Sequence, residues 1–411
     1  MTRKFELDWL RVIAILILLG YHTGMIFVSW GWHIQSDETS RVLETVMAWF
    51  HYWRMPLLLF ISGAGTFLAL GVRKPRQFLV ERHKRLFIPL VFGMLVIVPP
   101  QIYFERIEKF DSYLAFYPTV FELVPYPEGG SLSWHHLWFV LYLLVYSIVL
   151  LPLFLYLRSE KANRFFDWVN ALATKRHGFA AFLIPTLAAR IFFGDVLGYG
   201  DETHALIDDW NYFTYYGLFF LYGFICCRDR RLWDRIRERR RDNLALALGL
   251  LVPFYAAFFA PDFSRPVEIA YDVSAIGIAW FSILTAIGFG QVYLNRGSRL
   301  LEYSNEAIYP FYILHQTVII AIGYHVLKVR DGVWLSFVVI GLLSLLTSMA
   351  IYHFMIRPFH LMRLLFGMKL TPMSSRRALR LAGARSGQAP RGGTSAARER
   401  MTGYATTYGS E

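Results

Sequence analysis

The sequence predicts an all-α integral membrane protein with about ten transmembrane helices. Hydrophobic residues make up 55% of the 411 residues and charged residues only 18%, whereas a soluble domain carries about 25% charged residues. The mean hydropathy is +0.38. The apolar residues gather in runs of about 20, the length that crosses a bilayer as a helix, and these runs alternate with segments rich in Lys and Arg.

The first apolar run lacks the small-residue cleavage site of a signal peptide and is followed by similar runs, so we expect a retained transmembrane helix. The predicted spans cover residues 9–30, 46–71, 86–105, 136–157, 179–198, 211–227, 244–261, 271–294, 305–327 and 333–356. An even number of spans places both termini on one side of the membrane.

The basic residues predict which side that is. Lys and Arg are dense at residues 73–85, 158–176 and 228–241, which all fall between spans on the same side as the N-terminus. The loops on the other side carry few basic residues and many acids. Because cytoplasmic loops are enriched in Lys and Arg, we expect an N-in, C-in protein of the cytoplasmic (inner) membrane.

The charge and the chain ends predict the domain organisation. The net charge of +12 is explained by contacts with anionic lipids of the cytoplasmic leaflet, so no nucleic-acid partner is expected. Residues 1–370 form the predicted transmembrane domain. Residues 371–411 are rich in Gly, Ser, Ala and Arg, a composition that predicts a basic, disordered cytoplasmic tail. A homo-oligomer is compatible with the sequence.

An arginine and a histidine interrupt the first apolar run. Arg11 and His22 are eleven residues apart, which returns them to one helix face with roughly 16 Å between them along the axis. Arg11 is therefore expected near a membrane surface and His22 near the middle of the bilayer, where ionisable groups by default indicate function. The alternatives are that Arg11 merely pairs with Asp8 at i, i+3 and that His22 is a hydrogen-bonded packing residue.

A second pair lies where the third predicted span enters the bilayer. Arg82 and Arg85 are spaced i, i+3 and are expected to point the same way. Guanidinium groups bind phosphates with two parallel hydrogen bonds, and a helix N-terminus adds partial positive charge. The alternative is an ordinary basic anchor that contacts lipid headgroups.

Weaker candidates for substrate binding are side chains on or beside other spans, most of them near outer ends. His51 and Arg54, at the expected outer start of the second span, could meet a sugar hydroxyl or an acyl carboxylate, or could simply be an interfacial ring and a snorkelling arginine. The others are Trp134, His136, Trp138, Tyr309 and His315. No HExxH or CxxC motif is present, so no metal site is expected.

Five motifs in this order resemble acyltransferase family 3. They are LDWLR at residues 7–11 with the histidine at 22, FISG at 60–63, RHKRLFIP at 82–89, HLWFVLYLL at 136–144 and YPFYILH at 309–315. The resemblance covers about 350 residues and leaves out the basic tail. The segments around FISG and HLWFVLYLL are most similar to the branch that decorates osmoregulated periplasmic glucans, in which the acyl group is succinyl.

The resemblance implies an enzyme that moves an acyl group from cytoplasmic acyl-CoA to a hydroxyl of a glycan beyond the membrane. The family's essential Arg and His correspond to Arg11 and His22, and its RxxR motif, associated with the acyl-CoA donor, corresponds to Arg82 and Arg85. No fused extracytoplasmic hydrolase-type domain accompanies them. The helical domain would then carry all the chemistry, with acyl-CoA, succinyl-CoA in the glucan branch, as co-substrate.

His22 is expected to act as a general base on the acceptor hydroxyl, and a covalent acyl-histidine is the less favoured route. The oxyanion would be stabilised by Tyr309, Ser62 or a backbone amide near Pro310, among which the sequence does not choose. Two other functions stay open: a proton-coupled transporter or flippase that uses His22 as a relay, and a membrane sensor that signals through the basic tail.

Overall fold

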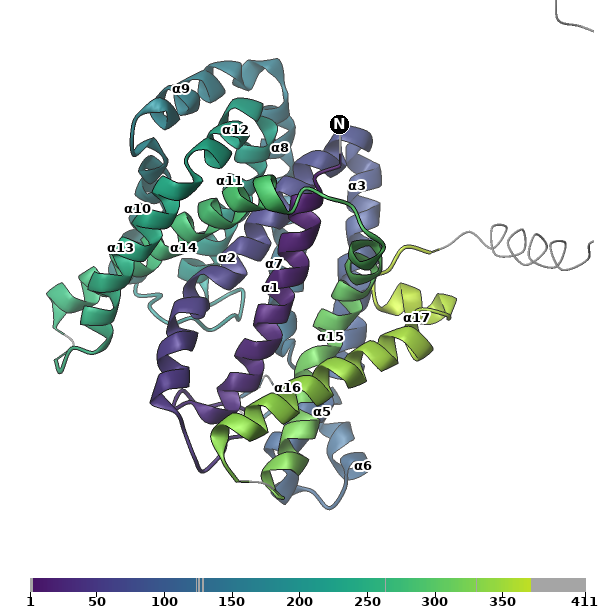
Figure 1. The fold of residues 1–411 in the computed structure, drawn as a ribbon. Helices are drawn as coiled ribbons and strands as arrows, with labels where there is room; N and C mark the ends of the chain where they lie inside the picture. Colours follow the sequence, from purple (N-terminus) through teal and green to yellow (C-terminus); the bar gives the residue numbers. More distant parts are fainter. Residues whose placement is uncertain are drawn as a thin grey trace, which may run out of the picture. The chain divides into compact units, whose positions relative to one another are not determined.

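A computed structural model describes residues 3–122, 124, 126–127, 129–262, 264–329 and 331–370. The described residues up to Met368 belong to one compact unit built of helices (Figure 1). The predicted disordered tail, residues 371–411, lies outside the described residues. The helices are α1 (Phe5–Gly24), α2 (Arg41–Val72), α3 (Pro75–Arg82), α4 (Ile88–Phe92), α5 (Pro99–Glu105), α6 (Tyr113–Phe116), α7 (Trp138–Val149), α8 (Leu151–Arg158), α9 (Asn163–Thr174), α10 (Leu183–Arg190), α11 (Trp210–Arg228), α12 (Arg230–Glu238), α13 (Arg240–Phe258), α14 (Arg265–Tyr293), α15 (Arg299–Leu327), α16 (Val333–Ala350) and α17 (His360–Leu365).

Among the described residues, seven helical segments are long and apolar enough to cross a membrane, or eight if one bent pair is counted as a span. They are Phe5–Phe27, Arg41–Val72, Pro75–Glu105, Gly178–Val196, Arg265–Tyr293, Arg299–Leu327 and Val333–Ile356, and the bent pair is His135–Val149 with Leu151–Arg158. The multi-pass membrane architecture is confirmed, whereas the count of ten is not. The N-in, C-in orientation stays a prediction.

The two remaining predicted spans are helical but less apolar. They correspond to α11 and α13, each 19 residues long. Tyrosines and an asparagine lower the hydropathy of α11, and the Arg240–Asn243 start lowers that of α13. Helix α11 packs inside the bundle on α2, so intramolecular contacts replace part of the lipid contact that a more apolar helix would make. Helix α13 packs on α14 at the edge of the bundle and leaves much of its surface exposed.

The span predicted at residues 136–157 is broken. Helix α7 ends at Val149, and α8 starts at Leu151 with a bend of 56°. Pro152 stands in the first turn of α8, where its missing N–H costs no hydrogen bond but where it ends the preceding helix.

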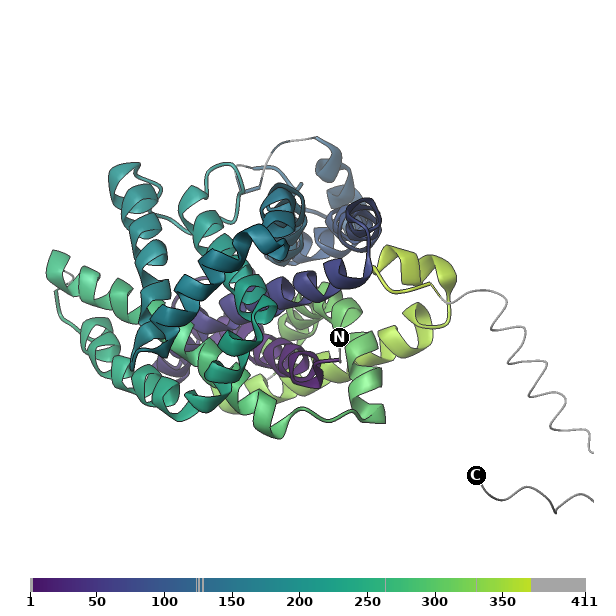
Figure 2. The same cartoon turned by 90° about the horizontal axis from the view of Figure 1, so that it is seen from above.

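Helix α1 is at the centre of the unit. It contacts α2, α14, α15 and α16, and the view along its axis shows neighbours on several sides (Figure 2). The basic end of the unit holds the start of α1 with α3, α9 and α12, where Lys4 lies over the Trp233 ring. The loop end holds the last turn of α1, the end of α5 and the segment of residues 197–209 (Figure 1).

Helices α2 and α11 cross with their backbones in close contact. A Cβ atom on Gly63 would meet the carbonyl oxygen of Phe220 at 1.8 Å, and one on Gly223 would meet that of Phe60 at 1.9 Å. Small residues allow such an approach between membrane helices. The glycine of the FISG motif therefore serves helix packing, and the crossing fixes the spacing of two helices that carry site residues.

Candidate active site

His22 and a histidine from a distant helix form a hydrogen-bonded pair in the middle of the bundle. His22 Nδ1, on α1, lies 2.9 Å from His315 Nε2, on α15, and the two rings are stacked with centroids 5.0 Å apart. His315 is fully buried, and its Nδ1 lies 2.5 Å from the carbonyl oxygen of Tyr312.

This chain of contacts assigns the tautomers. A carbonyl oxygen only accepts hydrogen bonds, so His315 Nδ1 must carry the proton that points to Tyr312. In a neutral imidazole, His315 Nε2 is then the acceptor and His22 Nδ1 the donor. His22 Nε2 is left unprotonated and without a hydrogen-bond partner among the described residues. A base with a free lone pair, oriented by a second group, is the arrangement that general-base catalysis requires.

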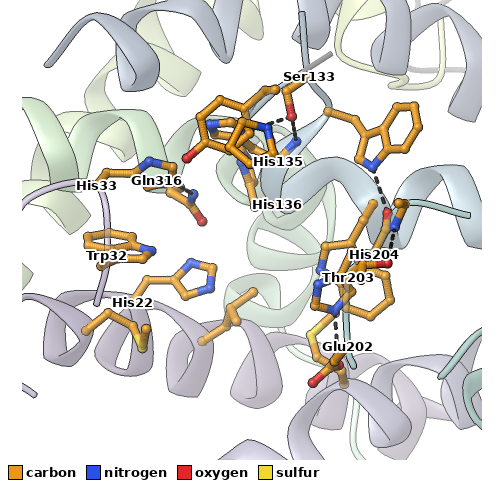
Figure 3. A pocket seen from close by; sticks show the side chains of 18 of the residues that line it. His22, Trp32, His33, Ser133, His135, His136, Glu202, Thr203, His204 and Gln316 are labelled. Carbon is orange, nitrogen blue, oxygen red and sulfur yellow. Dashed lines mark hydrogen bonds and ion pairs between the residues drawn. The ribbon is translucent and has the colours of Figure 1, made fainter. Parts of the chain in front are cut away.

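The free side of His22 faces a cavity of about 940 Å³. Its wall includes the exposed residues Ile207 and Asp208, so the cavity opens at the loop end. Figure 3 shows His22 and Trp32 on one side of this space and Glu202 and His204 on the other. Further lining residues are Leu18, Tyr21, Met25, His33, His51, Arg54, Met55, Met94, Tyr126, Pro127, Leu132, Ser133, Trp134, His135, His136, Trp138, Thr203, Ala205, Tyr216, Tyr312 and Gln316.

A polar network holds the α7 side of the cavity against α15. His136 is buried, its Nε2 lies 3.1 Å from the carbonyl oxygen of Ile313, and Tyr312 donates a hydrogen bond to its backbone oxygen. Its ring also packs on His315 at 5.4 Å. His136 therefore belongs to the support of the histidine pair.

The opposite wall is built around Glu202, in the segment between α10 and α11. Its carboxylate lies 3.0 Å from His204 Nε2 and 3.6 Å from His51 Nε2, and it accepts a hydrogen bond of 2.5 Å from Tyr216. Burial would raise the pKa of Glu202, but the two histidines outweigh burial and hold it well below its usual range. Trp138 stacks on His204 at 4.1 Å, and Trp134 donates to its backbone oxygen at 2.9 Å.

The arginine half of the predicted site lies at the basic end. Arg11 donates to Asn305 at 3.1 Å and pairs with Asp8 at 3.4 Å, so the i, i+3 pair foreseen as an alternative is present. Arg82 donates to Thr66 of α2 at 3.1 Å, and Arg85 is held by Glu81 at 3.3 Å and by the carbonyl oxygen of Gly367 at 3.1 Å.

The third span begins earlier than predicted, which changes the setting of Arg82 and Arg85. A helical segment runs continuously from Pro75 to Glu105, with a π-helical turn at His83–Phe87. The two arginines therefore lie about two turns or more inside the helix, and the helix N-terminus adds nothing to their charge. Pro75 occupies the first position of this helix and marks its start. A prediction from the length of the apolar run alone does not take this signal into account.

A comparison with known families decides the class of protein. A family model described as an acyltransferase domain, Acyl_transf_3, matches residues 4–353. The chain belongs to acyltransferase family 3. It is similar to glucans biosynthesis protein C of Escherichia coli strain SMS-3-5 / SECEC, with 23% identity over 349 residues, and to the K12 protein of the same name, with 22% identity over 349 residues. Each alignment covers 82% of this chain and 87% of the relative. No solved structure matches the chain.

Most of the weaker candidates of this acyltransferase gather at the cavity, including His51, Arg54, Trp134, His136 and Trp138. His315 supports His22 from behind. The two side-chain candidates for stabilising the oxyanion lie elsewhere, since neither lines this cavity: Ser62 donates to its own helix at Leu58, and Tyr309 packs against Gly367. The Tyr309 hydroxyl is buried without a hydrogen-bond partner.

One trio of side chains in this acyltransferase has the ligand types of a metal site. The ligand atoms of His33, Glu105 and His135 lie within 4.8 Å of one another. His33 Nδ1 already lies 2.6 Å from Glu105 Oε2, and Tyr126 donates to the same carboxylate at 3.0 Å. These bonds fix the loop of residues 28–40 to the end of α5 without a metal, and we assign none.

Glu202, His204 and the pairing of His22 with His315 are not predictable from the local sequence patterns. Glu202 counted only as one acid of an outer loop, and no periodicity relates it to His51 on a distant helix. His315 is the histidine of the YPFYILH motif, so the motif singles it out. Because it lies 293 positions from His22 in the sequence, no local pattern predicts that the two side chains are in contact.

Proposed function

We propose that this acyltransferase moves an acyl group, succinyl in size and charge, from cytoplasmic acyl-CoA to a hydroxyl group of an extracytoplasmic glycan such as a periplasmic glucan. One observation carries the proposal: the unprotonated His22 Nε2, oriented by His315, faces an open cavity lined by aromatic rings. Aromatic faces and scattered polar groups suit a sugar. The similarity to glucans biosynthesis protein C favours a glucan.

The proposed reaction follows from this geometry. An acceptor hydroxyl enters at the loop end and gives its proton to His22 Nε2 as its oxygen attacks the thioester carbonyl. The carbon–sulfur bond breaks, a carbon–oxygen ester bond forms, and the proton passes to the sulfur of the leaving CoA. His315 keeps the His22 ring in the correct tautomer while positive charge develops on it.

The donor is proposed to bind at the basic end, with the CoA phosphates on Arg11, Arg82 and Arg85. The roughly 16 Å between Arg11 and His22 is within reach of an extended pantetheine arm. Arg82 contacts Thr66, and Arg85 contacts the oxygen of Gly367 besides its ion pair with Glu81. Phosphate binding would exchange the two neutral partners for charged ones, which form stronger hydrogen bonds, and would compete with Glu81 for Arg85.

Mass spectrometry of envelope glycans from cells with and without the protein tests the proposal. The expected result is an ester of defined mass on a glycan that disappears with the protein and returns with the parent gene but not with the His22→Gln variant. Identical glycans in all strains, together with substrate flux that consumes no CoA, would instead support the transporter alternative. A deletion after Leu370 that abolishes function in an otherwise stable protein would support the sensor alternative.

The proposed orientation has its own test. Single cysteines introduced at Arg235, in α12, should react only with a reagent that reaches the cytoplasm, and cysteines at Asp208 only from outside. The opposite pattern would reverse the donor and acceptor ends.

A further inference from the structure

Arg54 is a cation inside the cavity wall that no acid in the described part of the chain neutralises. Its side chain is only 8% exposed, and none of the ion pairs among the described residues involves it. The apolar run alone predicts that Arg54 lies at the outer start of the second span, where it could snorkel to water. Helix α2 in fact begins at Arg41, so Arg54 lies between three and four turns inside the helix.

The surroundings of Arg54 leave part of its hydrogen-bonding capacity free. One terminal nitrogen donates to the carbonyl oxygen of His51 at 2.8 Å, and the guanidinium lies over the Tyr21 ring at 3.4 Å. Its Nε is buried and has no hydrogen-bond partner among the residues that the structure describes. Arginine stays charged in proteins, and a buried, unpaired charge is costly. These contacts offset only part of that cost, so the site favours a bound anion.

No acid among the described residues supplies that anion. Of the acids that line the cavity, Glu202 is engaged by His204, His51 and Tyr216, and Asp208 is exposed at the opening. A ligand carboxylate fits the planar fork of a guanidinium, which binds it with two parallel hydrogen bonds.

The position of Arg54 relative to His22 indicates which part of the substrate carries the carboxylate. Tyr21 is next to His22 on α1, with ring centroids 5.8 Å apart, and Arg54 stacks on Tyr21. Only one aromatic ring therefore separates the cation from the proposed base. In a four-carbon diacid, three bonds of about 1.5 Å carry the second carboxylate roughly 4 Å past the reacting carbonyl, which suits this spacing.

We infer that Arg54 binds the free carboxylate of the transferred acyl group and so selects half-acyl groups of dicarboxylic acids over neutral acyl groups of equal length. The inference rests on the proposed function and adds to it the residue that determines donor specificity. The carboxylate bound by Arg54 could also belong to an acidic group on the glycan. The experiment must therefore distinguish recognition of the donor from recognition of the acceptor.

The test measures kcat/KM for full-length protein in lipid nanodiscs with succinyl-CoA and with butyryl-CoA, which has a methyl group in place of the carboxylate. A neutral glucan oligosaccharide serves as acceptor. The parent should prefer succinyl-CoA by about 10²-fold, the usual effect of a buried, charged hydrogen-bonded pair. Arg54→Gln should remove most of this preference, and Arg54→Lys should keep part of it. Arg41→Gln, an exposed arginine on the same helix, is the matched control and should leave the preference unchanged.

Three results would overturn the inference: a parent without donor preference, an Arg54→Gln variant that keeps the parent's preference, or one that discriminates between neutral and acidic acceptors instead of between donors. Equilibrium binding of the two CoA thioesters to the parent and to Arg54→Gln gives a readout without turnover. If no donor supports transfer but succinyl-CoA still binds more tightly to the parent than butyryl-CoA does, the Arg54 inference stands and the proposed reaction fails.

Discussion

The two halves of α1 have opposite surroundings. At the Arg11 end, the arginines already have protein partners. Arg11 contacts Asp8 and Asn305, and Arg85 contacts Glu81 and the Gly367 oxygen. Around His22, the base has a free nitrogen and an open cavity. The difference teaches that, in the proposed reaction, the half that would receive the acceptor is organised before any substrate binds, whereas the half that would bind CoA must exchange partners first.

The largest expected effect comes from His22 itself. His22→Gln keeps polarity and approximate size but removes the titratable nitrogen, so turnover should fall by roughly 10² to 10⁴-fold while acyl-CoA binding persists. Steady-state kinetics and binding on the same preparation check this. His177→Gln, an exposed histidine beyond α9, is the control. Full activity in a well-folded His22→Gln protein would contradict the general-base role.

His315 should have the next largest effect, and its effect should depend on His22. His315→Gln is expected to lower kcat by about 10²-fold, because His22 loses the group that fixes its tautomer. The double variant His22→Gln, His315→Gln should be little worse than His22→Gln alone, since residues that act as one unit are not additive. Additive losses in a double-mutant cycle would mean that His315 has a separate role.

Substitutions at the proposed donor end should change acyl-CoA binding and leave the rate of the chemical step unchanged. Replacing both Arg82 and Arg85 by glutamine should weaken acyl-CoA binding by about tenfold or more, because charge-assisted hydrogen bonds to phosphate are lost. Lysine at both positions should restore only part of the affinity. Isothermal titration with acyl-CoA and with CoA checks this. Unchanged affinity in the glutamine variant would identify the arginines as lipid anchors.

The smallest effect concerns the stability of the cavity wall. Glu202→Gln should lower the free energy of unfolding by about 1–2 kcal/mol at neutral pH. The folded-state pKa of Glu202 is depressed, so its contribution is complete above the unfolded value of about 4.3 and is lost as the pH falls from there toward the folded value. The difference in unfolding temperature between the parent and Glu202→Gln should therefore narrow below about pH 4. Asp201→Asn, its exposed neighbour, should show no such difference.

Local patterns in the sequence were enough to predict the membrane class, most spans and the placement of Arg11 and His22 on α1. They were not enough for contacts between distant segments. The Glu202 wall comes from a segment without helical or strand periodicity, and the burial of Arg54 depends on where α2 starts, which is set by the Ser40 cap and not by hydrophobicity. Apolar content predicts α11 as a span, although Tyr215, Tyr216 and Tyr222 of this helix are buried in the protein and Tyr216 lines the cavity.

The packed middle of α1 has an electrical consequence. Between Arg11 and His22, the residues Val12, Ala14, Ile15 and Leu19 are buried in the apolar core, while water can enter the cavity from the loop end. A transmembrane voltage would then fall mainly across this apolar layer and little across the cavity. In the proposed orientation, His22 would exchange protons with the outer compartment. An anionic acyl group that passes outward through the layer gains up to about 2.3 kcal/mol per 100 mV when the inside is negative, so the membrane potential would favour delivery of a charged acyl group and oppose its return.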